Sequence, residues 1–475
     1  MNATEWINLI RTGKSAVVGL GKSNLPLIDF LLSNGARVVA RDKKTRESLG
    51  ELGNELEAKG VTLITGEGYL DHLEEDIIFR TPGLRPDLPA FVEALARGAR
   101  LTSEMELFLE LCPATVIGIT GSDGKTTTTT VTGLLLEAAC QKRGYGKAWV
   151  GGNIGQPLLP FVGQMSENDF AVVELSSFQL QTMRRSAHRA AITNVTPNHL
   201  NWHTDMAEYT DAKTNIYRHP PCQALVLNAE NEITQTLGRS CEQPVCWFSS
   251  VRTTPADFEG LCRPQDSAVY LADGYVTLWD GKIASPLLKR EEILLPGKHN
   301  LENYMTAIAL CREWLTPDVI GEVASSFLGV RHRLERVRVL DGVTYYNSSI
   351  DSTPTRTAAA LSALSPVRPI VICGGYDKQI PFAPLADTLY KHAKAVVLTG
   401  ATADAILEAL SSHSDADQNA LPIYREPDFQ GAVELAHRLA ASGDTVLLSP
   451  ACASFDAFQN FEERGDRFCA IVNSL

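Results

Sequence analysis

The chain has 475 residues and a formal net charge of −13, with 44% hydrophobic and 21% charged residues. This length exceeds what one hydrophobic core organises, so it predicts about three domains. The acidic balance excludes a nucleic-acid partner, because nucleic-acid phosphates must be met by a basic face. A small anionic substrate stays open, since a few local cations or a helix N-terminus can hold one.

The amino-terminal segment and the cysteines bear on location and redox state. Residues 1–14 lack a charged start followed by an apolar core and a small-residue cleavage site, so we expect no secretion. No apolar run approaches the roughly 20 residues that span a bilayer, and we therefore expect no membrane partner. The ten cysteines are scattered from Cys112 to Cys469 without CxxC pairs, which predicts neither a metal site nor disulfides. The expected location is the cytoplasm.

Helical and strand patterns alternate through most of the sequence, which predicts an α/β protein of mainly parallel sheets with helices on both faces. We expect three domains, at 1–104, 105–329 and 330–475. The first and third are predicted to be Rossmann-like, and the central one to be a P-loop-type domain.

The first domain opens with a predicted strand from Ser15, a glycine-rich turn, a helix over 25–34 and a second strand over 36–40. The turn, Gly19-Leu-Gly-Lys-Ser-Asn, and Asp42 some twenty residues on partly match a dinucleotide-binding fingerprint. Asn24 stands where that fingerprint has its third glycine, which weakens an NAD interpretation. Asp42 can equally serve as a turn or cap residue.

The strongest feature of the second domain is the segment 118–128, Gly-Ile-Thr-Gly-Ser-Asp-Gly-Lys-Thr-Thr-Thr, between a buried strand and a helical run. Glycines let successive N–H groups face one anion, and the following helix presents its positive end. Lys125 can reach the terminal phosphates and the Thr126 hydroxyl can ligate Mg²⁺. Gly-Lys-Thr also occurs by chance, but its place at a strand-to-helix turn favours a nucleotide loop. Only two residues separate Gly121 from the Gly-Lys pair, where the usual spacing is four, which disfavours a generic P-loop kinase or GTPase.

The shortened motif resembles that of the Mur ligases and their folylpolyglutamate synthetase relatives, and the resemblance extends over nearly the whole chain. It implies an ATP-dependent ligase with ATP as co-substrate and Mg²⁺ as cofactor. It also implies ATP contacts from Gly121, Ser122, Asp123, Gly124, Lys125, Thr126, Thr127, Asn300, Asn303 and Arg333.

Further segments match the family's motifs in a fixed order behind the nucleotide loop. They imply catalytic roles for Lys125, Asn153, Glu174, His199, Lys213 and Arg333. They imply metal ligation by Thr126, Glu174, His199 and, if it is carbamylated, Lys213. Taken singly, Glu174 would be read as a surface turn, His199 as a structural histidine and Lys213 as a solvated charge. Together they predict a Mg²⁺-ATP site, since Mg²⁺ prefers oxygen ligands and substrate phosphates.

The same resemblance assigns the two other substrates. The first turn would hold the diphosphate of UDP-N-acetylmuramoyl-L-alanine, and the implied binding residues are Lys22, Ser23, Asp42, Lys43, Thr81, Gly83, Asn153, Ser176 and Gln179. The closing segment 448–468 is similar to the signature of the D-glutamate-adding members of the family. By that match Lys378, Ser454 and Phe461 bind D-glutamate, Lys378 through the side-chain carboxylate.

One segment of the third domain departs from the family pattern, in which Asn-Asp-Ser-Lys-Ala-Thr-Asn is usual. Here Ser348, Ile350 and Ser352 replace the Asp, Lys and Thr. The cation near the incoming amino acid is therefore missing at its usual place, and Arg356 or backbone donors are the candidates to replace it.

The resemblance implies that the substrate carboxylate attacks the γ-phosphate of ATP and that the amine of D-glutamate then attacks the acyl phosphate, within a monomeric enzyme of peptidoglycan precursor synthesis. Three alternatives remain open at this point. They are a sister ligase with another amino acid, an NAD-dependent oxidoreductase, and a non-catalytic nucleotide-sugar-binding protein.

Overall fold

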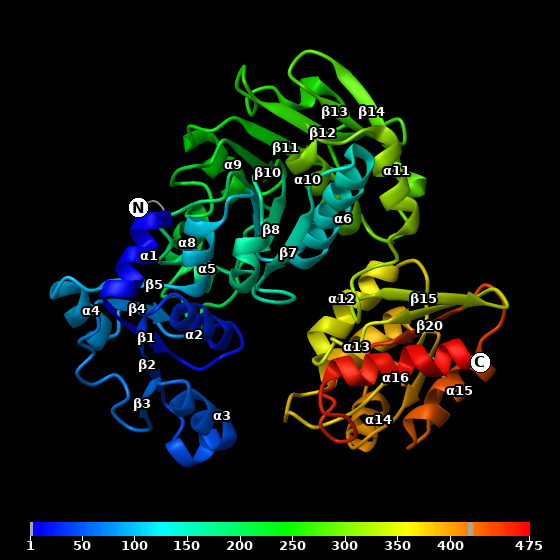
Figure 1. Ribbon diagram of the computed structural model, residues 1–475. Helices are drawn as coiled ribbons and strands as arrows, with labels where there is room; N and C mark the ends of the chain where they lie inside the picture. Colours follow the sequence, from blue (N-terminus) through cyan, green and yellow to red (C-terminus); the bar gives the residue numbers. More distant parts are fainter. Residues whose placement is uncertain (1–2, 417–420) are drawn as a thin grey trace. The chain divides into compact units, whose positions relative to one another are not determined.

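The computed structural model describes residues 3–416 and 421–475. The chain forms two compact units, one of Met1–Glu292 with Glu302–Val323 and the other of Ile293–Leu301 with Ala324–Leu475. The first unit holds a five-stranded and a nine-stranded sheet, and the second holds a six-stranded sheet. Figure 1 shows helices flanking each sheet. Three mainly parallel α/β sheets are what the alternating sequence pattern predicts.

The five-stranded sheet is parallel throughout and has the order β3-β2-β1-β4-β5. Its strands are β1 (Lys14–Val18), β2 (Arg37–Asp42), β3 (Thr62–Thr65), β4 (Ile77–Arg80) and β5 (Arg100–Thr102). The helices of this part are α1 (Ala3–Thr12), α2 (Asn24–Ser33), α3 (Arg46–Ala58), α4 (Pro89–Ala96) and α5 (Glu104–Leu111). The predicted second strand, 36–40, thus begins one residue later and continues to Asp42.

The nine-stranded sheet has the order β14-β13-β12-β11-β10-β9-β6-β8-β7, and only its last two strands, β13 and β14, run antiparallel to their neighbours. Its strands are β6 (Thr115–Thr120), β7 (Ala148–Gly152), β8 (Phe170–Glu174), β9 (Arg189–Ile192), β10 (Ala224–Asn228), β11 (Val245–Ser249), β12 (Ser267–Ala272), β13 (Tyr275–Trp279) and β14 (Ala284–Lys289). The helices are α6 (Lys125–Arg143), η1 (Leu159–Gln164), α7 (Ser177–Leu180), α8 (Met206–Thr214), α9 (Glu232–Ser240), η2 (Pro255–Phe258), η3 (Arg290–Glu292), α10 (Lys298–Cys311) and α11 (Pro317–Ser326).

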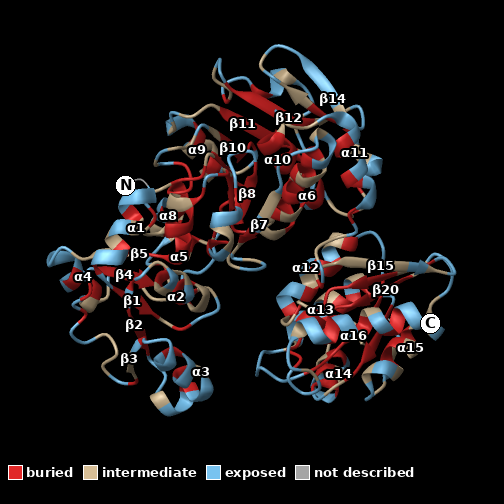
Figure 2. Cartoon of the chain, in the orientation of Figure 1, coloured by how far each residue is buried: buried red, intermediate tan, exposed pale blue. Residues whose placement is uncertain are grey.

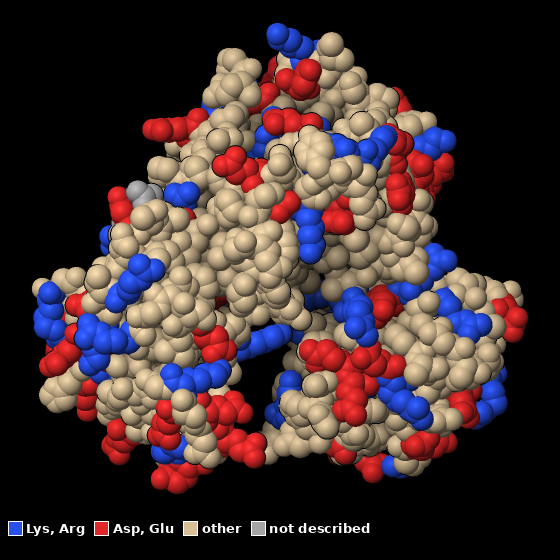
Figure 3. Space-filling view, in the orientation of Figure 1, with Lys and Arg blue, Asp and Glu red and all other residues tan. Residues whose placement is uncertain are grey.

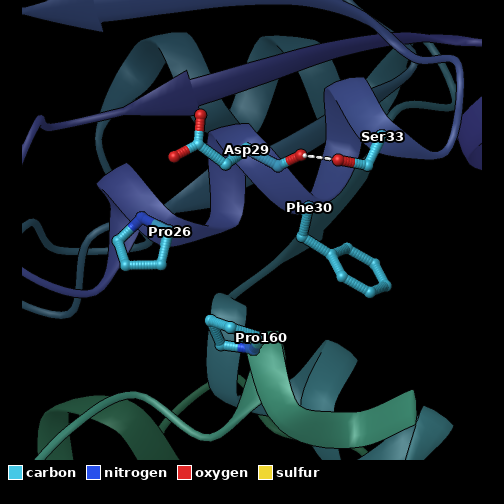
Figure 4. A pocket seen from close by; sticks show the side chains of 5 residues that line it. All are labelled: Pro26, Asp29, Phe30, Ser33 and Pro160. Carbon is cyan, nitrogen blue, oxygen red and sulfur yellow. Dashed lines mark hydrogen bonds between the residues drawn. The ribbon is translucent and has the colours of Figure 1, made fainter.

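The two sheets of the first unit share one hydrophobic core. A single cluster of buried side chains runs from Trp6 and Val17 in the first part to Val173 and Tyr270 in the second. Where α2 approaches η1, a hollow of about 360 Å³ lies between Pro26 and Phe30 on one side and Pro160 on the other (Figure 4). The shared core explains why these two sheets form one compact unit.

The six-stranded sheet of the second unit has the order β15-β16-β20-β17-β18-β19, with only β15 antiparallel. Its strands are β15 (Glu335–Leu340), β16 (Val343–Asn347), β17 (Ile370–Cys373), β18 (Ala395–Leu398), β19 (Ile423–Arg425) and β20 (Thr445–Leu448). The helices are α12 (Pro354–Leu364), α13 (Ala383–His392), α14 (Ala403–Ser411), α15 (Phe429–Leu439) and α16 (Phe461–Ser474).

The central strand β17 shows how this sheet is covered on both faces. Val371 packs in a cluster with α12, α13 and α14, whereas Ile370 and Ile372 pack in a second cluster with α15 and α16. Successive side chains of a strand point to opposite faces, so a continuous apolar run is what two covered faces require. Figure 2 shows the strands buried and the outer helix surfaces exposed. Figure 3 shows acidic and basic side chains interspersed on the visible face of each unit.

Candidate functional site

The loop between β6 and α6 has a backbone that its two flanking glycines make possible. Gly124 precedes the first helical residue with a φ of +80°, and a Cβ there would lie 2.5 Å from the Asn303 side-chain oxygen. A Cβ on Gly121 would lie 1.9 Å from Thr193 Oγ1. Both positions therefore exclude larger residues, because neighbouring polar groups approach the loop closely.

The loop is held from outside by the strand end at 193–194. Asn194 Oδ1 accepts a hydrogen bond from the Asp123 N–H at 2.9 Å, and Asn194 O accepts one from the Ser122 N–H at 2.9 Å. The Lys125 ammonium group donates to the carbonyls of Gly121 and Ser122 at 3.0 and 2.9 Å. The lysine side chain thus lies along the loop.

Glu174 stands at the carboxyl end of β8, directly beside β6, with Ile119 as its register partner. Its side chain is 2% exposed. Thr126 Oγ1 donates to one carboxylate oxygen at 2.8 Å, and Asn153 Nδ2 donates to the other at 2.9 Å. The Thr126 hydroxyl and the Asn153 amide NH₂ group therefore meet at the Glu174 carboxylate, beside the loop.

The Thr126 hydroxyl and the Glu174 carboxylate fit Mg²⁺, which takes hard oxygen ligands and completes its shell with water and phosphate. Among the described residues, no three His, Cys, Asp or Glu side chains gather in a way that would hold a metal on their own. A cation here would accordingly be shared between Thr126, Glu174 and the substrate phosphates.

Lys213 lies on α8 and is 1% exposed. Its amine donates to Gly121 O at 2.9 Å and lies 4.5 Å from the centre of the Tyr209 ring. Burial, and next the charge of Lys125, lower the pKa of Lys213 well below its usual value. The alternative interpretation of Lys213 as a solvated surface charge is thus wrong, because this lysine is buried against the nucleotide loop.

His199 is exposed and has a left-handed conformation with a φ of +55°. Its ring packs edge-on against Phe178, with the ring centres 4.9 Å apart. Burial, followed by the charges of Lys125 and Lys213, lowers the pKa of His199. This lowering favours the neutral imidazole, the form that can bind a metal.

Asn300 and Asn303, which are predicted to contact ATP, lie on one helix, α10. Asn303 is 5% exposed, and its Oδ1 accepts a hydrogen bond from Thr128 Oγ1 at 3.2 Å. Asn300 donates to Pro296 O at 2.7 Å and belongs to the second compact unit. Thr127 is buried at the start of α6.

In the five-stranded part, Asp42 is 8% exposed and already bonded to main chain. Its two oxygens accept hydrogen bonds from the N–H groups of Leu20 and Lys44, at 2.7 and 2.9 Å. The Asn24 amide donates to the carbonyls of Val18 and Gly19 at 3.3 and 2.8 Å. Asp42 and Asn24 thus stabilise this turn through hydrogen bonds to its backbone. This agrees with the alternative interpretation of Asp42 as a turn or cap residue.

The other residues predicted to hold the UDP-linked substrate also belong to the first unit. Lys22 donates to Gly155 O at 3.1 Å, and Trp202 Nε1 donates to Gly83 O at 3.0 Å. Ser176 caps α7 in a reciprocal capping box with Gln179. Of the remaining predicted residues, Ser23 and Thr81 are half-buried and Lys43 is exposed.

The second unit holds the residues predicted for D-glutamate. Lys378 is exposed and its ammonium group lies 3.3 Å from Ser352 Oγ. Ser454 is 1% exposed, and its hydroxyl has no hydrogen-bond partner within the described part of the chain. Phe461 begins α16, and its carbonyl accepts a hydrogen bond from Ser349 Oγ at 2.8 Å. Arg333 belongs to the same unit.

Three residues of these sites were not predicted from the sequence. Tyr209 OH lies 3.0 Å from Ser122 Oγ, and Asn194 holds the loop as described above. Arg464 is 2% exposed and bridges the segments at Ser349 and Ala453. In each case the only sign in the sequence was a polar residue in a family motif to which no chemical role had been assigned.

Comparisons with known proteins decide the family. Three Mur ligase domain models match the chain, a MurD-like N-terminal domain over 13–103, a middle domain over 119–311 and a glutamate ligase domain over 332–452. A UDP-N-acetylmuramoylalanine–D-glutamate ligase of Clostridium novyi is 46% identical over 474 residues, which cover 99% of both chains. The chain belongs to the Mur ligase family.

Two further comparisons agree with this assignment. A UDP-N-acetylmuramoylalanine–D-glutamate ligase of Clostridium perfringens is 44% identical over 474 residues, again 99% of both chains. The crystal structure of the UDP-N-acetylmuramate–alanine ligase of Thermotoga maritima has a TM-score of 0.55 at 20% identity and covers 97% of this chain and 99% of its own. The predicted family, fold class and enzyme class, an ATP-dependent amide-forming ligase, are thereby confirmed. Within residues 3–416 and 421–475, none of the helices has the length and apolarity needed to cross a bilayer.

Proposed function

We propose that this Mur ligase joins D-glutamate to UDP-N-acetylmuramoyl-L-alanine with hydrolysis of ATP to ADP and phosphate, in peptidoglycan precursor synthesis. The observation that carries the proposal is the meeting of Thr126, Glu174 and Asn153 at the mouth of a glycine loop, beside the ammonium group of Lys125. This arrangement supplies cation and hydrogen-bond donors for a triphosphate next to an amide group that can orient a carboxylate.

In the first step a carboxylate oxygen of the L-alanyl group attacks the γ-phosphorus of ATP, the bond to the β-phosphate oxygen breaks, and ADP leaves. Lys125 and the N–H groups of the glycine loop hold the phosphates in line, and positioning with charge neutralisation accounts for most of the acceleration in such transfers. Asn153 is proposed to orient the carboxylate.

In the second step the neutral amine of D-glutamate attacks the acyl carbon, phosphate leaves, and the ammonium proton is lost to give the amide. The tetrahedral oxyanion formed on the way needs hydrogen-bond donors aimed at it, and Lys125 and Asn153 are proposed to supply them. A bound Mg²⁺, held by Thr126 and Glu174 with His199, would neutralise phosphate charge.

We further propose that Lys213 is carbamylated. Carbon dioxide reacts with a neutral amine, and the burial of Lys213 beside Lys125 favours the neutral form. The product is an anion that would offset the charge of Lys125 and add an oxygen ligand to the metal site. Nuclear magnetic resonance of the protein in ¹³C-bicarbonate should show a carbamate carbon that Lys213→Arg lacks, and a spectrum without that signal overturns the proposal.

For the two other substrates we propose the contacts implied by the family resemblance. Lys22 and Lys43 would bind the diphosphate of the UDP group, and Ser454 and Lys378 the D-glutamate. The buried Ser454 hydroxyl, which has no partner within the described residues, supports this proposal, because a substrate carboxylate would satisfy it.

The decisive experiment mixes the purified protein with UDP-N-acetylmuramoyl-L-alanine, ATP, Mg²⁺ and a panel of D- and L-amino acids, and measures phosphate release together with product mass. We expect product with D-glutamate only. Product with L-glutamate on a folate substrate would indicate the sister ligase, nicotinamide binding without ATP turnover the oxidoreductase, and binding without product the non-catalytic alternative. Each of these outcomes refutes the proposal.

We also propose that the enzyme is a monomer and that it is located in the cytoplasm. The location follows the substrates, since ATP and nucleotide sugars are cytoplasmic metabolites. Light scattering coupled to size-exclusion chromatography tests the first part, and a mass near twice 51.7 kDa would refute it.

A further inference from the structure

The loop between β16 and α12, residues 348–353, departs from the family pattern, but an acidic and a basic side chain still lie in or next to it. The usual acid and cation are replaced by Ser348 and Ile350. An amino diacid carries two carboxylates, and both must find donors when they leave water. The structure shows where this chain keeps its charges.

The acid of this loop has moved three residues along the chain. Asp351 is 6% exposed, and its carboxylate accepts a hydrogen bond from Ser449 Oγ at 2.8 Å. The Ser348 side chain also hydrogen-bonds this carboxylate. An Asp351 carboxylate therefore lies against the position from which the usual acid is missing.

Arg356 provides a cation at the position that lacks its lysine. Its side chain is exposed, and Nη1 donates to the carbonyl of Ile350 at 3.0 Å. Arg356 stands in the first turn of α12, where the partial positive charge of the helix N-terminus disfavours a cation. Helix stability therefore gives no reason for an arginine here.

A second cation reaches the same loop from another element. Lys378, which follows β17, lies 3.4 Å from Ser352 O and 3.3 Å from Ser352 Oγ. Arg356 uses one of its five N–H donors in the hydrogen bond to Ile350, and the exposed guanidinium leaves others for a ligand. Two exposed cations thus flank residues 350–352, while Asp351 beneath them is bonded to hydroxyl groups.

We infer that Arg356 binds the α-carboxylate of the incoming D-glutamate, while Lys378 binds its side-chain carboxylate. This inference rests on the proposed function and identifies the residue that replaces the missing cation. A guanidinium can grip a carboxylate through two parallel N–H donors, which a lysine cannot do. Arg356 accordingly contributes to the choice of an amino diacid.

The test combines a protein change with matching changes in the ligand. Arg356→Gln is assayed with D-glutamate, with D-isoglutamine, which lacks the α-carboxylate, and with D-glutamine, which lacks the side-chain carboxylate. Arg438→Gln is the matched control, because Arg438 is an exposed arginine in the last turn of α15. Where an analogue is not converted, its inhibition constant against D-glutamate replaces the KM.

We expect Arg356→Gln to raise the KM for D-glutamate and the constant for D-glutamine about tenfold to hundredfold, the range for one charge-assisted pair. The constant for D-isoglutamine and the KM values for ATP and the UDP-linked substrate should stay unchanged. Arg356→Lys should give an intermediate KM, and it serves as the test if the glutamine variant does not fold by circular dichroism.

Two outcomes overturn the inference. One is an unchanged KM for D-glutamate, and the other is a loss of equal size with D-isoglutamine or with ATP. A wild-type protein that makes no product from D-glutamate would instead refute the proposed function, so the two failures are distinguishable.

Discussion

Removing the guanidinium of Arg464 should destabilise the second unit more than any surface change near it. This side chain is 2% exposed and donates to four oxygens, namely Ser349 Oγ at 3.0 Å, Ser349 O at 2.9 Å, Cys452 O at 3.1 Å and Ala453 O at 3.0 Å. It therefore ties the loop after β16 to the segment after β20.

The size of the effect follows from these four bonds. Arg464→Met keeps the length of the stem but leaves four acceptors without their donor, at roughly 1 kcal/mol each. Burial lowers the pKa of Arg464 to about 10, so the charge is held at neutral pH against a desolvation cost that the methionine removes. We expect a net loss of about 2–4 kcal/mol in the free energy of unfolding of this unit.

Urea unfolding followed by circular dichroism measures this loss, with the two compact units fitted as separate transitions. Arg467→Met is the matched control, since Arg467 lies one turn away on α16, is exposed and bonds only Gln430 in the described structure, at 2.7 Å. The control should change stability by less than about 0.5 kcal/mol. Equal effects of the two variants would refute the reasoning.

Three other changes have directions fixed by the structure. Burial raises the pKa of Glu104 to about 7, so ionisation of this carboxyl lowers the free energy of unfolding as pH rises from about 4.5 to 7. The free energy of unfolding of Glu104→Gln relative to wild type should therefore rise by up to about 3 kcal/mol between pH 5 and pH 8. A difference in urea unfolding that does not change with pH would contradict this. Asp42→Ala should lower the free energy of unfolding of the first unit by about 2 kcal/mol, because two N–H donors lose their acceptor, while Asp42→Asn should lose less in the same assay. Glu174→Gln should reduce kcat/KM about a hundredfold or more and raise the Mg²⁺ concentration needed for half-maximal rate, whereas unchanged kinetics would remove Glu174 from the site.

The elements around the nucleotide loop could be predicted because their signal is local. The strand β6, its glycine turn and α6 follow from an apolar run, two required glycines and a polar helix start, all within thirty residues. Glu174 and Lys213 were placed by motif order, and their burial beside the loop followed only from the fold. The burial of a lysine depends on which helix covers it, which no short segment of sequence specifies.

The division of the chain into compact units depended on contacts that sequence patterns do not contain. Length predicts about three domains and three domain models match the chain, but no sequence pattern predicts that buried side chains of the first two sheets form one cluster from Trp6 to Tyr270. Arg464 was equally hidden, because an arginine within a charged stretch is usually solvated. Its partners are the Ser349 hydroxyl and the main-chain oxygens of Ser349, Cys452 and Ala453, and none of these residues carries a complementary charge that would reveal the contact in the sequence.

The glycine turn after β1 and the glycine loop after β6 look alike in sequence. They differ in which backbone groups are hydrogen-bonded by nearby side chains. In the first turn, Asp42 takes the Leu20 N–H and Asn24 takes the carbonyls of Val18 and Gly19. In a dinucleotide site the acid at the position of Asp42 would bind the ribose, but here Asp42 is bonded to main chain. The third glycine, which would let the backbone approach a pyrophosphate, is replaced by Asn24, whose side chain lies inside the turn. These bonds argue against an NAD site, and they are compatible with our proposal that the exposed Lys22 and Lys43 bind the diphosphate of a nucleotide sugar.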